Sequence, residues 1–211
     1  MLRIIVSILL FLTACAPADA PSSPTPQMVS VFASGAAQPW LSETNTCAQG
    51  LHIDVINAND PNLADISIRL GEPEAPTSFQ YQIGHDDLMV VTHRESPVQN
   101  LTIEAVRALF SNPQPAGVQI WVFAQGDDLQ QIFEREVMQG TKISSLAHLA
   151  VSPQQMSDTL NNDKQAVGFL PRRWKAGTTR DVFTLSHIPI LALTKTDPNN
   201  MIKELLACLQ K

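Results

Sequence analysis

The sequence has little positive charge and no long hydrophobic run. It contains 14 Lys and Arg residues against 20 Asp and Glu, which gives a formal net charge of -6. A protein that coats nucleic acid needs clustered Lys and Arg to neutralise phosphates, so we exclude nucleic acid as a partner. No apolar run reaches the roughly 18 residues of a membrane-spanning helix, and we expect none in the finished protein.

Motifs of catalytic and metal sites are also missing. The sequence contains no HExxH, CxxC or GxSxG pattern and no phosphate-binding P-loop. His85, Asp87 and His93 lie on one face of an extended run. At about 3.3 Å per residue the two histidines are roughly 26 Å apart, too far to share a metal ion. We therefore expect no metal, no cofactor and no enzymatic activity; a site assembled from distant residues is the alternative.

The chain does have enough apolar residues for a core. Its 211 residues are 44% hydrophobic, which is too high for a disordered chain. At about 150 residues per domain, the length fits one domain or two small ones. Nothing repeats at the period of a solenoid.

The N-terminus has the pattern of an export signal. Arg3 precedes a short apolar run that ends in Leu12-Thr13-Ala14-Cys15. These four residues resemble the bacterial lipobox, which implies that residues 1–14 are removed and that Cys15 is acylated. The alternative is an ordinary signal cut near Ala18 or Ala20. Residues 15–27 are rich in proline and form a tether, so the protein is expected to be extracytoplasmic and lipid-anchored to the bacterial cell membrane.

Two further cysteines remain in an exported and oxidising setting. Cys47 and Cys208 lie on helical patterns near opposite ends of the globular part. A disulfide between them would require the C-terminal helix to return to the N-terminal one. Two separately buried thiols are the alternative.

Strand and helix patterns alternate along the chain, which predicts an α/β architecture. The expected strands cover 28–33, 51–57, 65–70, 88–92, 117–124, 166–170 and 182–195. The expected helices cover 36–48, 102–111, 129–140, 152–161 and a last one that opens at 200. Thr102 is a candidate N-cap, and Ser152-Pro153-Gln154-Gln155 is a candidate capping box.

Three segments carry a resemblance to a known family. They are the strand and helix run IGHDDLMVV (83–91) to SPVQNLTIEAVRALFS (96–111), Phe133-Glu134 after the QIWVF strand, and AVGFL (166–170). In this order they resemble the phosphate-binding-protein-like family of periplasmic substrate-binding proteins. The resemblance implies a two-lobed type 2 periplasmic-binding-protein fold, each lobe a mixed sheet flanked by helices. Lobe 1 would comprise 28–92 and 178–211, and lobe 2 would comprise 93–177.

The resemblance also indicates where a ligand would bind. Ser34-Gly35 follows the first strand, Ser67 and Arg69 lie near the third, and Gln125-Gly126-Asp127-Asp128 stands where the family has a Gly-Ser-Gly-Thr turn. Asp127 or Asp128 would use up helix N–H groups as an N-cap and would repel a dianion. Phosphate is therefore disfavoured. The two aspartates either cap the helix or bind a cationic or hydroxyl-bearing ligand.

The expected function is capture of a small solute for an ABC permease by hinge closure, without covalent chemistry. The alternatives are a degenerate domain that serves as a ligand-free surface sensor or adaptor, and an enzyme on the same scaffold. One basic cluster, 172–175, is either a solvated turn at the lobe crossing or a contact for an anionic ligand or lipid headgroup. Trp40 and Trp121 are expected in the core.

Overall fold

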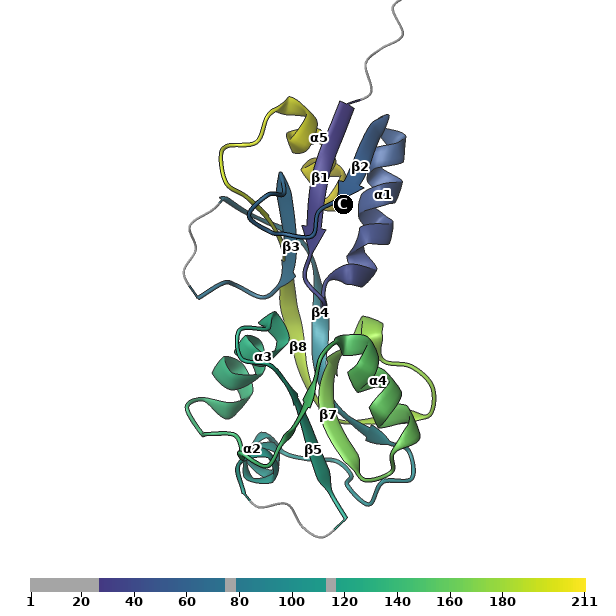
Figure 1. Ribbon diagram of the computed structural model, residues 1–211, viewed down its shortest axis with the longest axis vertical. Coiled ribbons are helices and arrows are strands. Elements are labelled where there is room, and N and C mark those ends of the chain that lie inside the picture. Colours follow the sequence, from purple (N-terminus) through teal and green to yellow (C-terminus); the bar gives the residue numbers. More distant parts are fainter. Residues whose placement is uncertain (1–26, 75–78, 113–116) are drawn as a thin grey trace, which may run out of the picture.

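Two long antiparallel strands run through the whole molecule (Figure 1). The computed structural model describes residues 27–74, 79–112 and 117–211, so the expected signal peptide, Cys15 and nearly all of the tether lie outside the described residues. The long strands are β4 (Phe79–His93) and β8 (Thr179–Thr194). They form the middle of an eight-stranded sheet with the order β2-β1-β3-β8-β4-β7-β5-β6. We call the group around β1–β3 lobe 1 and the group around β5–β7 lobe 2.

Lobe 1 is built from three short strands and two helices. β1 (Gln27–Ala33) lies parallel to both β2 (Ile53–Asn57) and β3 (Ile66–Leu70), and β3 pairs with the C-terminal half of β8. Helix α1 (Leu41–Gly50) directly follows a 3₁₀ helix (Gln38–Trp40), and α5 (Asn200–Leu209) is the last element of the chain. All of these elements fall where the sequence predicts them. Alternate residues of β1 and β3 are buried, as expected for strands that face a core on one side.

A disulfide joins the two helices of lobe 1. Cys47 on α1 and Cys208 on α5 are bonded, with their Cα atoms 5.9 Å apart. The predicted return of the C-terminal helix to the N-terminal one is therefore confirmed. A cross-link over 161 residues stabilises the fold by about 5 kcal/mol on the chain-entropy account.

Lobe 2 has parallel strands, three longer helical segments and a short 3₁₀ helix (Arg172–Trp174). β5 (Gln119–Phe123) lies parallel to β6 (His148–Ala150) and to β7 (Ala166–Pro171), and β7 pairs antiparallel with β4. The helices are α2 (Ile103–Ser111), α3 (Asp128–Ile132), which continues as a π-helix (Phe133–Met138), and α4 (Pro153–Asn162). The rings of Phe133 and Phe169 stack at 4.1 Å in its core. Each lobe thus has a mixed sheet with helices, as expected.

The side chains of both predicted N-cap residues, Thr102 and Ser152, accept a hydrogen bond from the first turn of their helix. Thr102 accepts a hydrogen bond from the backbone N–H of Ala105, as predicted for an N-cap. Ser152 accepts one from Gln155, but the Gln155 amide oxygen accepts from Val151 instead of from Ser152. One of the two hydrogen bonds of the expected capping box is therefore present, and the other comes from Val151 in place of Ser152.

β4 is much longer than the expected strand at 88–92. Its first half is polar and largely exposed, so it lacks the apolar run that marks the second half. Its partner changes between Asp86 and Leu88: earlier residues pair with 188–194 of β8, and later ones pair with both β8 and β7. From Leu88 onward β4 thus has the lobe 2 strand β7 as a second neighbour. Gly84 lies beside Trp40, and a Cβ there would stand 2.2 Å from the indole ring.

Candidate functional site

The predicted ligand residues Ser34 and Asp128 contact each other directly. Ser34 follows β1 in lobe 1, and Asp128 opens α3 in lobe 2. The Ser34 hydroxyl donates to Oδ2 of Asp128 at 2.5 Å, and the backbone N–H of Leu70 donates to the same oxygen at 3.0 Å. A buried carboxylate of lobe 2 therefore accepts two hydrogen bonds from lobe 1.

The neighbouring aspartate has a different role. Asp127 is the N-cap of α3, and its Oδ1 accepts from the backbone N–H of Leu129 at 2.9 Å. Burial, and then the charge of Asp128, raise the pKa of Asp127 to about 6. The helix-capping alternative therefore describes Asp127. Asp128 bridges the two lobes, which the sequence alone did not indicate.

Some of the remaining predicted ligand residues contact the other lobe, and others do not. Arg69 donates from Nη2 to the amide oxygen of Gln131 across the lobes at 2.9 Å, and burial lowers its pKa. A Cβ on Gly35 would lie 3.3 Å from the Pro153 ring, so Gly35 packs against the start of α4. Ser67 is half-buried on β3 and has no part in the Ser34–Asp128 contact.

Gln125 and Gly126 are exposed on the turn before α3. Gln125 lines a separate cavity of lobe 2, described below. The structure thus brings Ser34, Gly35, Arg69 and Asp128 to the boundary between the lobes. It does not gather all eight predicted residues around one space.

The basic cluster at 172–175 also connects the lobes. The indole N–H of Trp174 donates to the carbonyl of Ala36 at 3.0 Å. The Arg173 guanidinium lies 4.0 Å above the ring of Trp40 and forms an ion pair with Glu43. Trp40 is buried, as predicted, whereas Trp121 is only half-buried and stacks on His148. The cluster is a contact between lobes, and neither of the two expected roles describes it.

A polar cluster marks the place where the long strands cross from one lobe to the other. Arg172 donates from Nε and Nη2 to Oδ2 of Asp87 at 3.0 and 2.8 Å, and the backbone N–H of His187 donates to Oδ1 at 3.2 Å. Burial opposes ionisation of Asp87, but the hydrogen bonds from Arg172 and His187, together with the charge of Arg172, outweigh it and lower the pKa. The rings of His85 and His187 lie 5.3 Å apart. Across 27–74, 79–112 and 117–211, no three His, Cys, Asp or Glu residues are arranged to hold a metal ion.

A small cavity lies between the lobes beside this crossing. Its volume is about 330 Å³, and lobe 1, lobe 2 and β8 all line it. Gly71 and Glu72 come from lobe 1, Arg135 and Glu136 from lobe 2, and 185–189 from β8. Arg135 donates to Glu136 at 2.7 Å and to the carbonyl of Glu72 at 3.3 Å. None of these residues was predicted, because no family motif covers them.

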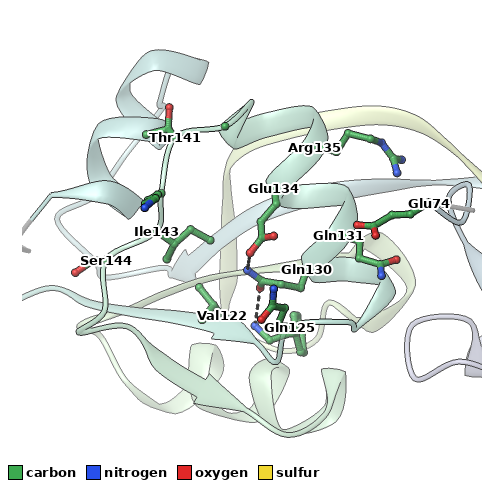
Figure 2. Close-up of a pocket in the computed structure, with 13 residues that line it drawn as sticks. Glu74, Val122, Gln125, Gln130, Gln131, Glu134, Arg135, Thr141, Ile143 and Ser144 are labelled. Atoms are coloured by element: carbon green, nitrogen blue, oxygen red, sulfur yellow. Dashed lines mark hydrogen bonds between the residues drawn. The ribbon is translucent and has the colours of Figure 1, made fainter.

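A larger cavity lies in lobe 2 next to α3. Its volume is about 800 Å³, and Figure 2 shows Gln130 and Glu134 pointing toward each other inside it. Gln125 and Val122 lie below them, and Glu74 stands near Gln131 and Arg135 at one end. This cavity was not predicted either.

Comparisons with known proteins concern the fold. No protein-family model matches the chain, and no curated protein sequence matches it. Solved structures do match. A protein assigned as a phosphate ABC transporter substrate-binding protein from Clostridium perfringens, with bound phosphate, is 13% identical and has a TM-score of 0.74, over 87% of this chain and 93% of that one.

Two other solved structures match at lower TM-scores. An ABC-type phosphate transport receptor from Vibrio cholerae is 17% identical, with a TM-score of 0.63 over 87% of this chain and 93% of that one. The OxyR2 regulatory domain from Vibrio vulnificus is 11% identical, with a TM-score of 0.63 over 92% and 97%. The chain has a periplasmic-binding-protein type 2 fold, which it shares with these phosphate-transport proteins and with the OxyR2 regulatory domain. At these identities the likeness shows the fold alone.

Within the described ranges, no helix is both long and apolar enough to cross a membrane.

Proposed function

We propose that the protein is an extracytoplasmic solute-binding lipoprotein, anchored through Cys15, that closes its two lobes over a small organic cation and presents it to an ABC permease. The observation that carries this proposal is the cavity of about 330 Å³ bounded by both lobes and by β8. A ligand that touches both lobes stabilises the closed arrangement and so couples binding to hinge motion. The mechanism involves no covalent step.

The charges around this cavity favour a cation. Glu72 and Glu136 contribute two carboxylates, whereas Arg135 is the one arginine or lysine in the lining and is already paired with Glu136. The carboxylates of the lining therefore outnumber its arginine and lysine side chains. A small amine would find a carboxylate in a partly desolvated setting, where charge pairing is stronger than in bulk water.

Phosphate and similar oxyanions are poor candidates. The hydroxyl of Ser34 and the N–H of Leu70, which could donate to an anion, already donate to Asp128. A second anion at that place would lose those donors and meet a buried carboxylate.

A thermal-shift screen tests the proposal. We expect putrescine or choline to raise the melting temperature in a concentration-dependent manner, and inorganic phosphate to leave it unchanged. Glu136→Gln should weaken the apparent affinity, taken from the concentration dependence of the shift, by about tenfold, because the variant removes one carboxylate of the cavity. Glu104→Gln on exposed α2 is the matched control. A phosphate-induced shift, or no response to any cation, would contradict the proposal.

A ligand-free adaptor is the second candidate, and one observation favours it. The lobes are already bridged by protein groups on both sides of the boundary, through Asp128, Arg173 and Trp174. If no compound in the screen raises the melting temperature and the protein is closed in solution, the adaptor is favoured over the transport receptor.

A further inference from the structure

The cavity of about 800 Å³ in lobe 2 has features of a binding site that are independent of the lobe boundary. It is an open cavity, bounded by β5, by α3 with its π-helical continuation, and by the loop 140–144. Apart from Glu74, all of its lining residues belong to lobe 2. Hinge closure is therefore not needed to form it.

One carboxylate in this cavity is held in a fixed orientation. Gln130 is buried at 4% exposure, and its amide oxygen accepts from the backbone N–H of Phe123 at 3.0 Å. The same amide then donates from Nε2 to Oε1 of Glu134 at 2.7 Å (Figure 2). The strand β5 thus sets the direction of Gln130, and Gln130 sets that of Glu134. Among the described residues, no hydrogen bond or ion pair ends on the second carboxylate oxygen, Oε2, of Glu134.

The opposite charge is supplied by the loop after the helix. Lys142 lines the cavity, and in the described part of the chain its ammonium group has no carboxylate partner. By contrast, six other Lys and Arg side chains among the described residues form ion pairs, in a chain where acidic residues are in excess. Thr141 and Gln125 add a hydroxyl and an amide to the lining.

The backbone around the cavity is unusual. Residues Phe133–Met138 form a π-helix, in which the N–H of Gln139 donates to the carbonyl of Glu134 at 2.9 Å. π-helical turns are rare and concentrate at functional sites. Gln139 and Gly140 then take left-handed conformations, with φ of 47° and 85°. A non-glycine residue in this region persists only where its surroundings require it, and this turn is what brings 141–144 over the cavity.

We propose that this cavity binds a small zwitterion of the amino-acid or dipeptide type. Glu134 binds the ligand's ammonium group, and Lys142 pairs with its carboxylate. The amides and the hydroxyl of the lining form hydrogen bonds with the polar atoms between these two ends of the ligand. A lone anion would leave Glu134 without a charged partner, and a lone cation would leave Lys142 without one. The volume exceeds that of a single amino acid, which leaves room for a side chain or a second residue.

Titration of ¹⁵N-labelled protein with L-glutamine and with L-alanyl-L-alanine tests the proposal. At least one of them should give saturable shifts at the Gln130 side-chain amide and at Gly140, with a Kd below about 1 mM. N-acetylation or C-terminal amidation of the same probe should weaken binding by about tenfold, because each removes one of the two charges. Glu134→Gln and Lys142→Gln should each have a similar effect on the unmodified probe.

Two lobe 1 variants serve as controls. Glu204→Gln and Lys195→Gln change the same charges on exposed positions away from the cavity, and should bind like the wild type. The absence of saturable shifts up to about 10 mM overturns the proposal. So does binding that is insensitive to both cavity variants when their ¹⁵N spectra show an intact fold.

Discussion

Two adjacent aspartates show how much a single position matters in this protein. Asp127 serves its own helix as an N-cap, whereas Asp128 reaches into the other lobe and accepts from Ser34 and Leu70. The two carboxylates are close enough that the charge of Asp128 raises the pKa of Asp127. Residue type alone could not separate these roles, because both residues are acceptable N-caps.

The pKa of Asp127 gives a pH-dependent contribution to stability. Its folded value of about 6 lies above the roughly 3.9 of an unfolded Asp, so the folded state binds the extra proton between these values. Asp127 therefore stabilises the fold at acidic pH, and this stabilisation is lost as the pH rises from about 4 to about 6. Because Asp127 is only partly buried, solvent screening reduces the effect to roughly 1–2 kcal/mol.

Urea unfolding of wild type and Asp127→Asn at several pH values checks this expectation. The difference in unfolding free energy between the two proteins should change with pH by roughly 1–2 kcal/mol between about pH 4 and 6, with the wild type losing stability relative to the variant. Taking the difference cancels the other carboxylates. A difference that stays constant across this range would show that Asp127 titrates normally.

Among the elements, the long crossing strand β4 depends on a close contact with lobe 1. Gly84 leaves room for the indole of Trp40, and a Cβ there would come within 2.2 Å of it. No real Cβ contact is that short, so either the buried ring or the strand must move. Trp40 also carries Arg173 on its face, which ties this contact to lobe 2.

Gly84→Ala should therefore destabilise the protein by about 1–3 kcal/mol through overpacking. Chemical denaturation followed by tryptophan fluorescence measures the change. Gly50→Ala is the matched control, since a Cβ at Gly50 meets nothing within 4 Å. Equal stabilities of the two variants would contradict the close packing of Trp40 on β4.

Element by element, the sequence predicted the short structures better than the long ones. The strand at 28–33 and the helices at 36–48 and 102–111 have clear apolar periodicity and caps, and they are present. β4 was recognised only in its buried half, because its other half is polar and gains its strand conformation from pairing with β8. The π-helix was expected as an ordinary helix, since no periodicity distinguishes one additional residue in a turn.

The candidate sites were harder to predict than the fold. Ser34 and Asp128 could be placed near the lobe boundary through a resemblance to a family of known arrangement. The direct contact between them could not be predicted, because Ser34 and Asp128 are 94 residues apart in the sequence and the contact depends on how the two lobes come together. Lys142 and Arg135 lie outside every motif. Glu134 belongs to one of the segments that carry the resemblance, but that segment gave it no ligand role, and only the tertiary structure brings the three residues to cavities.

At the scale of the whole molecule, the lobes are bridged at separate points. Asp128 with Ser34, Arg69 with Gln131, and Arg173 with Trp40 and Glu43 each join residues of lobe 1 and lobe 2. The exposed ion pair alone contributes little. The buried carboxylate contributes more, because its loss leaves Ser34 and Leu70 without an acceptor.

The double variant Asp128→Ala with Arg173→Ala should therefore favour an open arrangement. Small-angle X-ray scattering should detect a larger radius of gyration than in the wild type, while the circular dichroism spectrum keeps its α/β shape. Lys203→Ala, which removes an ion pair with Asp197 inside lobe 1, should leave the radius of gyration unchanged. An unaltered radius in the double variant would mean that the remaining contacts, among them Arg69 with Gln131 and Trp174 with Ala36, are enough to hold the lobes together.

The bond between Cys47 and Cys208 closes most of the chain into a covalent ring. Lobe 2 belongs entirely to that ring, so a protease that nicks any one of its loops produces two pieces that stay linked. Such a nicked molecule would run as a single band on a non-reducing gel and split only after thiol treatment. This arrangement lets the protein survive a backbone cut in lobe 2 without losing half of itself.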